Sequence, residues 1–301
     1  MTWMLLSIGS AVFLGFYEIA KKASLKENAV PPVLFFNVLT AALLWLPLIL
    51  SSQFFPKGVP AHILKVESLS STGHSLLFLK SLIAGSSWIF ASFALKHLPM
   101  SIAAPIRASS PLWTISIAVV FLRERPDFWQ WLGILIILIS FFVFTLVGRM
   151  EGIHFHRNRW VGFMVIATLL GACSALYDKF LLQNCRMHAA TVQAWFSVYL
   201  VLVMTPLVTH WYIRGQATAP FQWRGSIPMI SILLLFSDFL YFTAIETPGG
   251  LISVISPLRR TSIVIAFIAG IRIYGEKNPA PKAVCILSML VGVYVLSLSR
   301  G

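Results

Sequence analysis

The chain has 301 residues, of which 58% are hydrophobic and 11% are charged, and its mean hydropathy is +0.84. A soluble domain needs more charge to cover its surface, so this composition excludes that class and predicts a polytopic membrane protein. The formal net charge of +13 comes from scattered basic residues, without the basic arm or glycine-rich loop that nucleic-acid binding needs. We therefore expect lipid head groups of the bilayer, and no nucleic acid, as partners of the loop cations.

The first apolar segment, residues 2–22, has the length of a signal peptide. It lacks a basic start and a small-x-small cleavage motif, and it contains Glu18. We therefore interpret this segment as a retained first helix.

Taking about 20 apolar residues as one crossing, we predict an all-α integral membrane fold with ten transmembrane helices. They lie near residues 2–22, 31–50, 75–95, 100–122, 128–147, 160–182, 189–211, 226–245, 250–271 and 282–299. The connections are short and rich in turn residues, as in ENAVPP, RERPD and EKNPAP. None of them is long enough for a separate soluble domain.

An internal repeat emerges when residues 94–146 are laid on residues 246–298 without a gap. The polar and proline matches are Ser101 with Ser253, Pro105 with Pro257, Arg107 with Arg259, Ser110 with Ser262, and Glu124 with Glu276. Apolar matches mean little in membrane sequences, but proline, arginine and glutamate at fixed spacing rarely coincide by chance. We therefore predict two five-helix repeats, residues 1–148 and residues 160–301.

Because five is odd, the second repeat must enter the membrane from the opposite side. Inverted repeats of this kind are typical of secondary transporters, which bind their substrate near the bilayer midplane between the halves. Duplication therefore predicts pseudo-symmetry, two gates and alternating access.

Three arginines lie inside predicted helices, Arg107 in SIAAPIRASSPLWTI and the adjacent Arg259 and Arg260 in SVISPLRRTSI. Each costs about 2.5–3.5 kcal/mol at the centre of a membrane helix on insertion scales, so we expect them to face a wet cavity or an acidic partner. Neighbouring guanidinium groups repel each other unless something negative lies between them, and their planar donors suit phosphate or carboxylate. Two interpretations stay open, an anion-binding cavity and full ion pairing inside the bundle.

The acids within the predicted helices are Glu18, Asp178 and Asp238. Each is a candidate counter-ion for a buried cation, or a coupling residue whose protonation changes as access alternates. Lys80 lies about five residues into its predicted helix. Its side chain either extends outward to the membrane surface or adds to the three arginines, which together with it outnumber the three acids.

Other polar and aromatic residues near the arginines are candidate substrate contacts. Ser253, Ser256 and Arg260 recur at helical spacing and can share one face, and the two hydroxyls either bind substrate or bond to their own helix's carbonyls. Tyr241 and Trp88 either stack on a substrate or pack within the bundle. We predict no catalytic residue, metal site or cofactor, because no His/Asp or Cys/His arrangement lies at membrane depth and the three cysteines are dispersed.

The pattern P-x-R-x-x-S in the fourth and ninth helices, each followed by a glutamate, resembles the EamA-like branch of the drug/metabolite transporter superfamily. The resemblance covers nearly the whole chain and implies a central cavity, with the fifth and tenth helices at the periphery. In the similar plastid sugar-phosphate translocators, basic residues placed like Arg107, Arg259 and Arg260 hold phosphate. The wider EamA-like group exports amino acids and other metabolites, for which arginines would bind a carboxylate.

Two signals conflict on membrane orientation. Lysine and arginine are more numerous in the odd-numbered connections, which would place those connections in the cytoplasm, whereas the resemblance implies that both termini are cytoplasmic. It also implies a multi-pass protein of the bacterial cytoplasmic membrane. The sequence is compatible with a monomer and with a homodimer.

From these observations we expect a secondary transporter for a small anionic or zwitterionic metabolite, such as an organophosphate, a carboxylate or an amino acid. The alternative is a non-transporting or lipid-handling membrane protein whose arginine ion pairs are structural. Enzymatic activity is not expected, and the absence of Walker motifs argues against ATP-driven transport by this chain.

Overall fold

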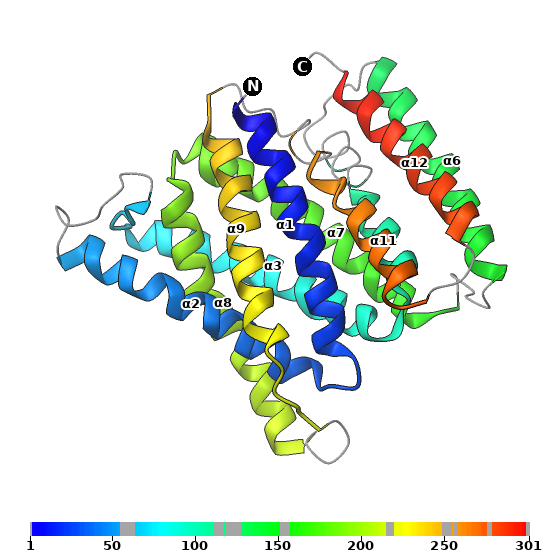
Figure 1. Cartoon of the computed structure of the whole chain (residues 1–301). Coiled ribbons are helices and arrows are strands. Elements are labelled where there is room, and N and C mark those ends of the chain that lie inside the picture. The colour runs from blue at the N-terminus through cyan, green and yellow to red at the C-terminus, as the bar shows by residue number, and fades with distance from the viewer. Residues whose placement is uncertain are drawn as a thin grey trace.

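A computed structural model describes residues 2–54, 64–110, 113, 117, 128–150, 157–214, 220–248, 255, 258–275 and 279–298. The described part of the chain is helical and contains no strand (Figure 1). Its helices are α1 (Thr2–Leu25), α2 (Val30–Phe54), α3 (Ser71–His97), α4 (Met100–Ala108), α6 (Phe128–Met150), α7 (Arg159–Lys179), α8 (Ala189–Arg214), α9 (Ser226–Glu246), α11 (Ile263–Arg272) and α12 (Pro279–Ser297). A π-helical turn, η2 (Phe180–Asn184), continues α7.

Six of these helices are long and apolar enough to cross a membrane, namely α1, α2, α3, α7 with η2, α8 and α9. The all-α class is therefore confirmed for the described residues, and the count of ten crossings stays a prediction. Two of the predicted crossings, residues 100–122 and 250–271, are only partly described, because most of 111–127 and of 249–257 lies outside the described residues.

The helices pair across the two halves of the sequence. The contacting pairs are α1 with α9, α3 with α7, α2 with α8, α4 with α11, and α6 with α12. If each helix is replaced by its counterpart in the other half, the α1–α9 pair becomes the α7–α3 pair. Each of the other three pairs maps onto itself. In Figure 1 the α6–α12 pair lies at one edge of the molecule, where the resemblance places the fifth and tenth helices.

Both predicted arginine helices are interrupted at the same aligned position. The helix α4 ends in a turn at Ser109, whose N–H bonds to the Pro105 carbonyl at 3.1 Å. In the second half, residues 258–260 are helical, a turn follows at 261–262, and α11 begins after it. Each arginine segment therefore lies at a break in the helix, and broken helices are the usual lining of transporter binding sites.

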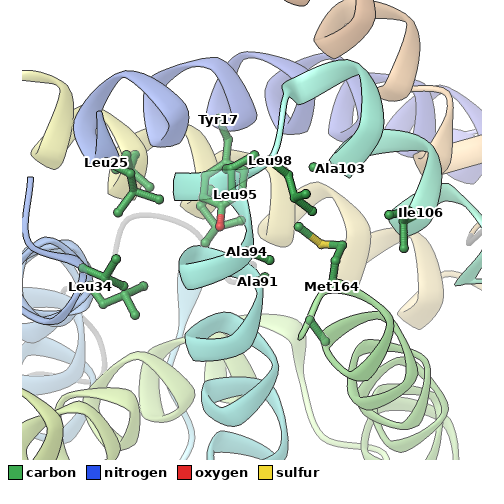
Figure 2. Packing of buried hydrophobic residues seen from close by; sticks show 14 of the residues in the cluster. Tyr17, Leu25, Leu34, Ala91, Ala94, Leu95, Leu98, Ala103, Ile106 and Met164 are labelled. Atoms are coloured by element: carbon green, nitrogen blue, oxygen red, sulfur yellow. The ribbon is translucent and has the colours of Figure 1, made fainter. Parts of the chain in front are cut away.

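The bundle is held by apolar and small residues where helices approach closely. Figure 2 shows buried side chains of α1, α2, α3, α4 and α7 in one cluster, including Tyr17, Leu95 and Met164. At Gly15 of α1 an added Cβ would lie 2.6 Å from the Cβ of Ile265, so only glycine allows α1 to approach α11 this closely.

Candidate functional site

A cavity of about 100 Å³ lies between the two halves. Its walls come from α1, α3, α4, α7, α8, α9 and the short helical segment 258–260. The lining residues are Leu14, Tyr17, Lys80, Ala84, Ser87, Trp88, Arg107, Gly171, Ser174, Ala175, Asp178, Phe196, Leu234, Asp238, Tyr241, Phe242, Arg259 and Arg260. Pockets for drug-sized ligands usually measure about 300–1,000 Å³, so this cavity favours a compact ligand.

Most of the residues predicted from the sequence line this one cavity, although they come from distant parts of the chain. They are Arg107, Arg259, Arg260, Trp88, Tyr241, Asp178 and Asp238. Glu18 lies in an adjoining hollow of about 20 Å³, which Arg107 and Arg260 also line. Ser253 and Ser256 lie outside the described residues, as do Pro257, Glu124 and Glu276.

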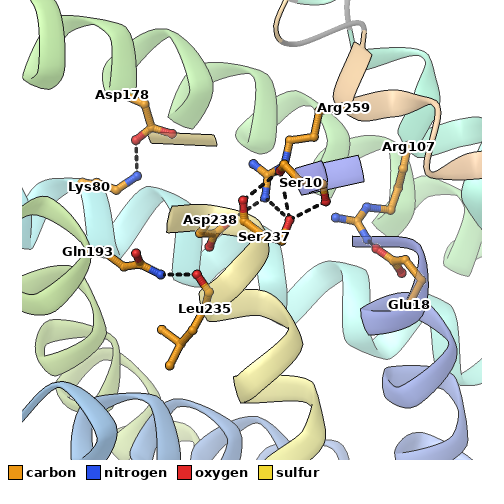
Figure 3. A network of polar contacts seen from close by, with 10 residues as sticks. All are labelled: Ser10, Glu18, Lys80, Arg107, Asp178, Gln193, Leu235, Ser237, Asp238 and Arg259. Atoms are coloured by element: carbon orange, nitrogen blue, oxygen red, sulfur yellow. Dashed lines mark hydrogen bonds and ion pairs between the residues drawn. The ribbon is translucent and has the colours of Figure 1, made fainter. Parts of the chain in front are cut away.

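The first arginine is neutralised within its own half. Arg107, in the last turn of α4, forms an ion pair with Glu18 of α1 (Figure 3). The Arg107 side chain is 24% exposed and that of Glu18 is 11% exposed. This pair therefore lies at the cavity wall and keeps some access to solvent.

The matched arginine of the second half also pairs with a carboxylate of its own half and has further contacts. Arg259 forms an ion pair with Asp238 of α9 and donates a hydrogen bond to Ser237 Oγ at 3.2 Å. Its guanidinium carbon lies 4.3 Å from the ring centroid of Tyr241, a cation–π contact. The aromatic ring of Tyr241 therefore contacts Arg259, and the residue also lines the cavity.

Ser237 connects this pair to α1. The hydroxyl of Ser10 donates to the Ser237 carbonyl at 2.8 Å, and the hydroxyl of Ser237 donates to the Ser10 carbonyl at 2.9 Å (Figure 3). These reciprocal bonds join α1 to α9 at the level of Arg259, so the helices that carry Glu18 and Asp238 are fixed to each other.

The structure decides between the two positions that the sequence left open for Lys80. The Lys80 side chain is 2% exposed and forms an ion pair with Asp178 of α7. Its ammonium lies 4.4 Å from the ring centroid of Phe196 and 5.0 Å from that of Phe242.

The reason is the true start of α3. The hydroxyl of Ser70 accepts a hydrogen bond from Gly73 N at 3.2 Å and caps the helix, which therefore begins four residues before the predicted 75. Lys80 is consequently too deep to reach the membrane surface. The sequence signal that could have revealed this is the serine pair Ser70–Ser71, because serine is a preferred N-cap residue.

Arg260 differs from the other cations of the cavity wall. Its Nη2 donates to Ser110 Oγ at 3.0 Å, a contact between the two halves. Its Nε is buried and has no hydrogen-bond acceptor among the described residues, where Arg260 also forms no ion pair. Arg107 and Arg259 line the same cavity. Those two arginines are paired with carboxylates, whereas Arg260 has no carboxylate partner among the described residues. The anion-binding interpretation therefore depends on the Arg260 guanidinium.

Trp88 packs edge to face on Phe196, with ring centroids 5.8 Å apart. Both rings line the cavity, as do the apolar side chains of Leu234 and Phe242. The cavity thus combines charged groups with an aromatic wall that a carbon skeleton can contact.

Comparison with known proteins identifies the family. The model of the EamA-like transporter family matches residues 1–146. Residues 1–146 therefore belong to the EamA-like transporter family. The family is part of the drug/metabolite transporter superfamily, so this EamA protein is a multi-pass membrane protein of a transporter family, and its members are transporters rather than enzymes. No curated protein matches the sequence.

A solved structure described as "Crystal structure of protein" resembles the fold of this EamA protein. The two chains are 15% identical, with a TM-score of 0.65, and the match covers 98% of this chain and 97% of the other. Identity this low shows a shared fold over nearly the whole chain and gives no information on substrate.

Proposed function

We propose that this EamA protein is a secondary transporter that moves a small anionic or zwitterionic metabolite across the membrane by alternating access. The substrate class comprises organophosphates, carboxylates and amino acids. The observation that carries the proposal is Arg260, a cation at a central cavity without a carboxylate partner among the described residues. An uncompensated buried charge is costly, and a bound anion removes that cost.

The proposed roles follow the geometry of the cavity. Arg260 would contact the substrate directly, and Arg107 and Arg259 would contribute once the substrate competes with their carboxylates. Trp88 and Tyr241 would contact the substrate's carbon skeleton, and Ser253 and Ser256 stay proposed contacts. Glu18, Asp178 and Asp238 would act as counter-ions or coupling residues.

The pairing of helices supports an inverted repeat of ten crossings. Pairs that map onto themselves when the halves are exchanged are what a two-fold relation between the repeats would produce. Alternating access would then follow from movement of one half against the other around the cavity. We further propose the bacterial cytoplasmic membrane as the location.

A specific observation favours a second candidate function. Lys80, Arg107 and Arg259 each have a carboxylate partner inside the bundle, which is what a non-transporting or lipid-handling protein with structural ion pairs would contain. The two candidates differ in what they require of Arg260, which a structural protein would not need.

The test begins with a thermal-shift screen of the detergent-purified protein against sugar phosphates, carboxylates and amino acids. The stabilising compound is then used for uptake into proteoliposomes by the wild type and Arg260→Gln. Loss of uptake by a variant that still folds would support the transporter. Unchanged uptake would exclude the site assignment, and the absence of any stabilising metabolite would favour the structural alternative.

A further inference from the structure

The charged groups of the cavity allow a statement about substrate valence, which rests on the proposed function. Three carboxylates each neutralise one cation, giving the pairs Lys80–Asp178, Arg107–Glu18 and Arg259–Asp238. Within the described residues, the remaining charge of the cavity wall is the guanidinium of Arg260. The wall and its counter-ions therefore carry one net positive charge.

A further buried cation, Lys21, does not change this sum. Its ammonium bonds to the Tyr17 hydroxyl at 3.1 Å, and Lys21 is not among the residues that line the cavity. Lys179 follows Asp178 in α7, but its side chain is exposed. Both lysines are therefore left out of the charge that a bound substrate meets.

The hydrogen-bond donors of Arg260 indicate which anion fits the cavity. Nη2 bonds to the neutral hydroxyl of Ser110, and Nε has an N–H without an acceptor in the described structure. A carboxylate accepts two parallel hydrogen bonds from one edge of a guanidinium, which a spherical anion cannot do. The Nε of Arg259 is likewise buried without an acceptor, so the adjacent residue offers another unmet donor.

We infer that the site selects a compact anion with a single net negative charge, a monocarboxylate in its simplest form, over dianions and zwitterions. A dianion would leave one negative charge uncompensated beside Glu18, Asp178 and Asp238. A zwitterion would leave the Arg260 charge uncompensated and would bring an ammonium close to three cations. The small volume and the aromatic wall of Trp88 and Phe196 fit a short carbon chain behind the carboxylate.

The test compares three probes of equal carbon number and different charge: lactate, malonate and alanine. Their affinities for the purified full-length protein are measured by calorimetry or concentration-dependent thermal shift at neutral pH. Lactate is expected to bind at least about ten-fold more tightly than malonate or alanine, since one uncompensated buried charge costs more than the 1.4 kcal/mol of a ten-fold change. Equal or tighter binding of malonate or alanine would overturn the inference.

Variants that change the charge sum sharpen the test. Asp238→Asn adds one positive charge and should reverse the order in favour of malonate. Asp178→Asn makes the same change to the sum from another helix, and serves if Asp238→Asn does not fold. Arg260→Gln removes the surplus charge and should abolish the preference for lactate. An unchanged order in folded charge variants would overturn the inference.

Matched controls alter charges away from the cavity. Lys179→Gln and Glu27→Gln change exposed residues that do not line it, and both should keep the wild-type order of affinities. Failure of the valence inference is distinguishable from failure of the proposed function. Tight malonate binding that depends on Arg260 would contradict the valence inference alone. Wild-type protein that binds none of the three probes and no compound of the wider screen would contradict both the valence inference and the proposed function.

Discussion

Arg107 and Arg259 occupy aligned positions in the two halves of this EamA protein, yet their surroundings differ. Both form an ion pair within their own half, Arg107 with Glu18 of α1 and Arg259 with Asp238 of α9, and Arg259 also stacks on Tyr241. The second half also carries Arg260, where the aligned residue of the first half is Ala108. The comparison teaches that the repeat determines where a buried charge lies, while neighbouring helices determine whether it is neutralised.

The cavity wall therefore contains cations of two kinds, those with a carboxylate and Arg260 without one among the described residues. A paired cation can serve the fold, because removing it leaves a buried acid. Arg260 does not serve the fold in this way. Replacing a paired cation should thus lower the unfolding temperature, whereas replacing Arg260 should not.

The largest effect is expected at the most buried pair. Lys80→Met leaves the buried Asp178 without its cation, and removing one partner of a buried pair typically costs about 3–5 kcal/mol. We expect a large fall in the unfolding temperature of the purified protein. The double variant Lys80→Met with Asp178→Leu should regain most of that loss, and a double variant as unstable as the single one would contradict the pairing.

A smaller loss is expected at the partly exposed pair of the first half. Glu18→Gln leaves Arg107 unpaired, but the Arg107 side chain is 24% exposed, against 2% for Lys80. The expected cost is about 1–3 kcal/mol, the range for an unmet polar partner. Measured side by side, Glu18→Gln should lower the unfolding temperature less than Lys80→Met does, and the reverse order would refute this difference in burial.

Arg260→Gln should act in the opposite direction. It removes a cation that shares a cavity with Arg107 and Arg259, so we expect the unfolding temperature to stay constant or rise. Arg259→Gln is the matched variant and should destabilise, because Asp238 loses its partner. If both variants destabilise equally, Arg260 has a structural role and the comparison between the two kinds of cation fails.

Another small effect concerns the contact of Arg260 with the first half. Ser110→Ala removes the acceptor of the 3.0 Å hydrogen bond, which is worth about 0.5–1.5 kcal/mol. The aligned variant Ser262→Ala serves as control, because Ser262 makes no side-chain cap in the described structure. Thermal shifts of both variants should rank Ser110→Ala as the more destabilised.

Several features of the site followed from the sequence. The aligned P-x-R-x-x-S segments predicted that Arg107 and Arg259 lie at equivalent places, and insertion costs predicted that they face a cavity or an acid. The structure brings them together with Trp88, Tyr241, Asp178 and Asp238. The depth of Lys80 stayed open at the level of sequence, because it depends on where α3 begins, and a Ser70 cap shifts that start by one turn.

The sequence by itself determined the membrane class, the helical periodicity and the duplicated arginine segments, because hydropathy and repeats are properties of the chain read residue by residue. Only the tertiary structure decided which acid neutralises which cation and that Arg260 contacts Ser110 across the halves. Those choices depend on a few ångströms between helices distant in the chain. Coulombic and hydrogen-bond energies change steeply over such distances, and one sequence does not encode them locally.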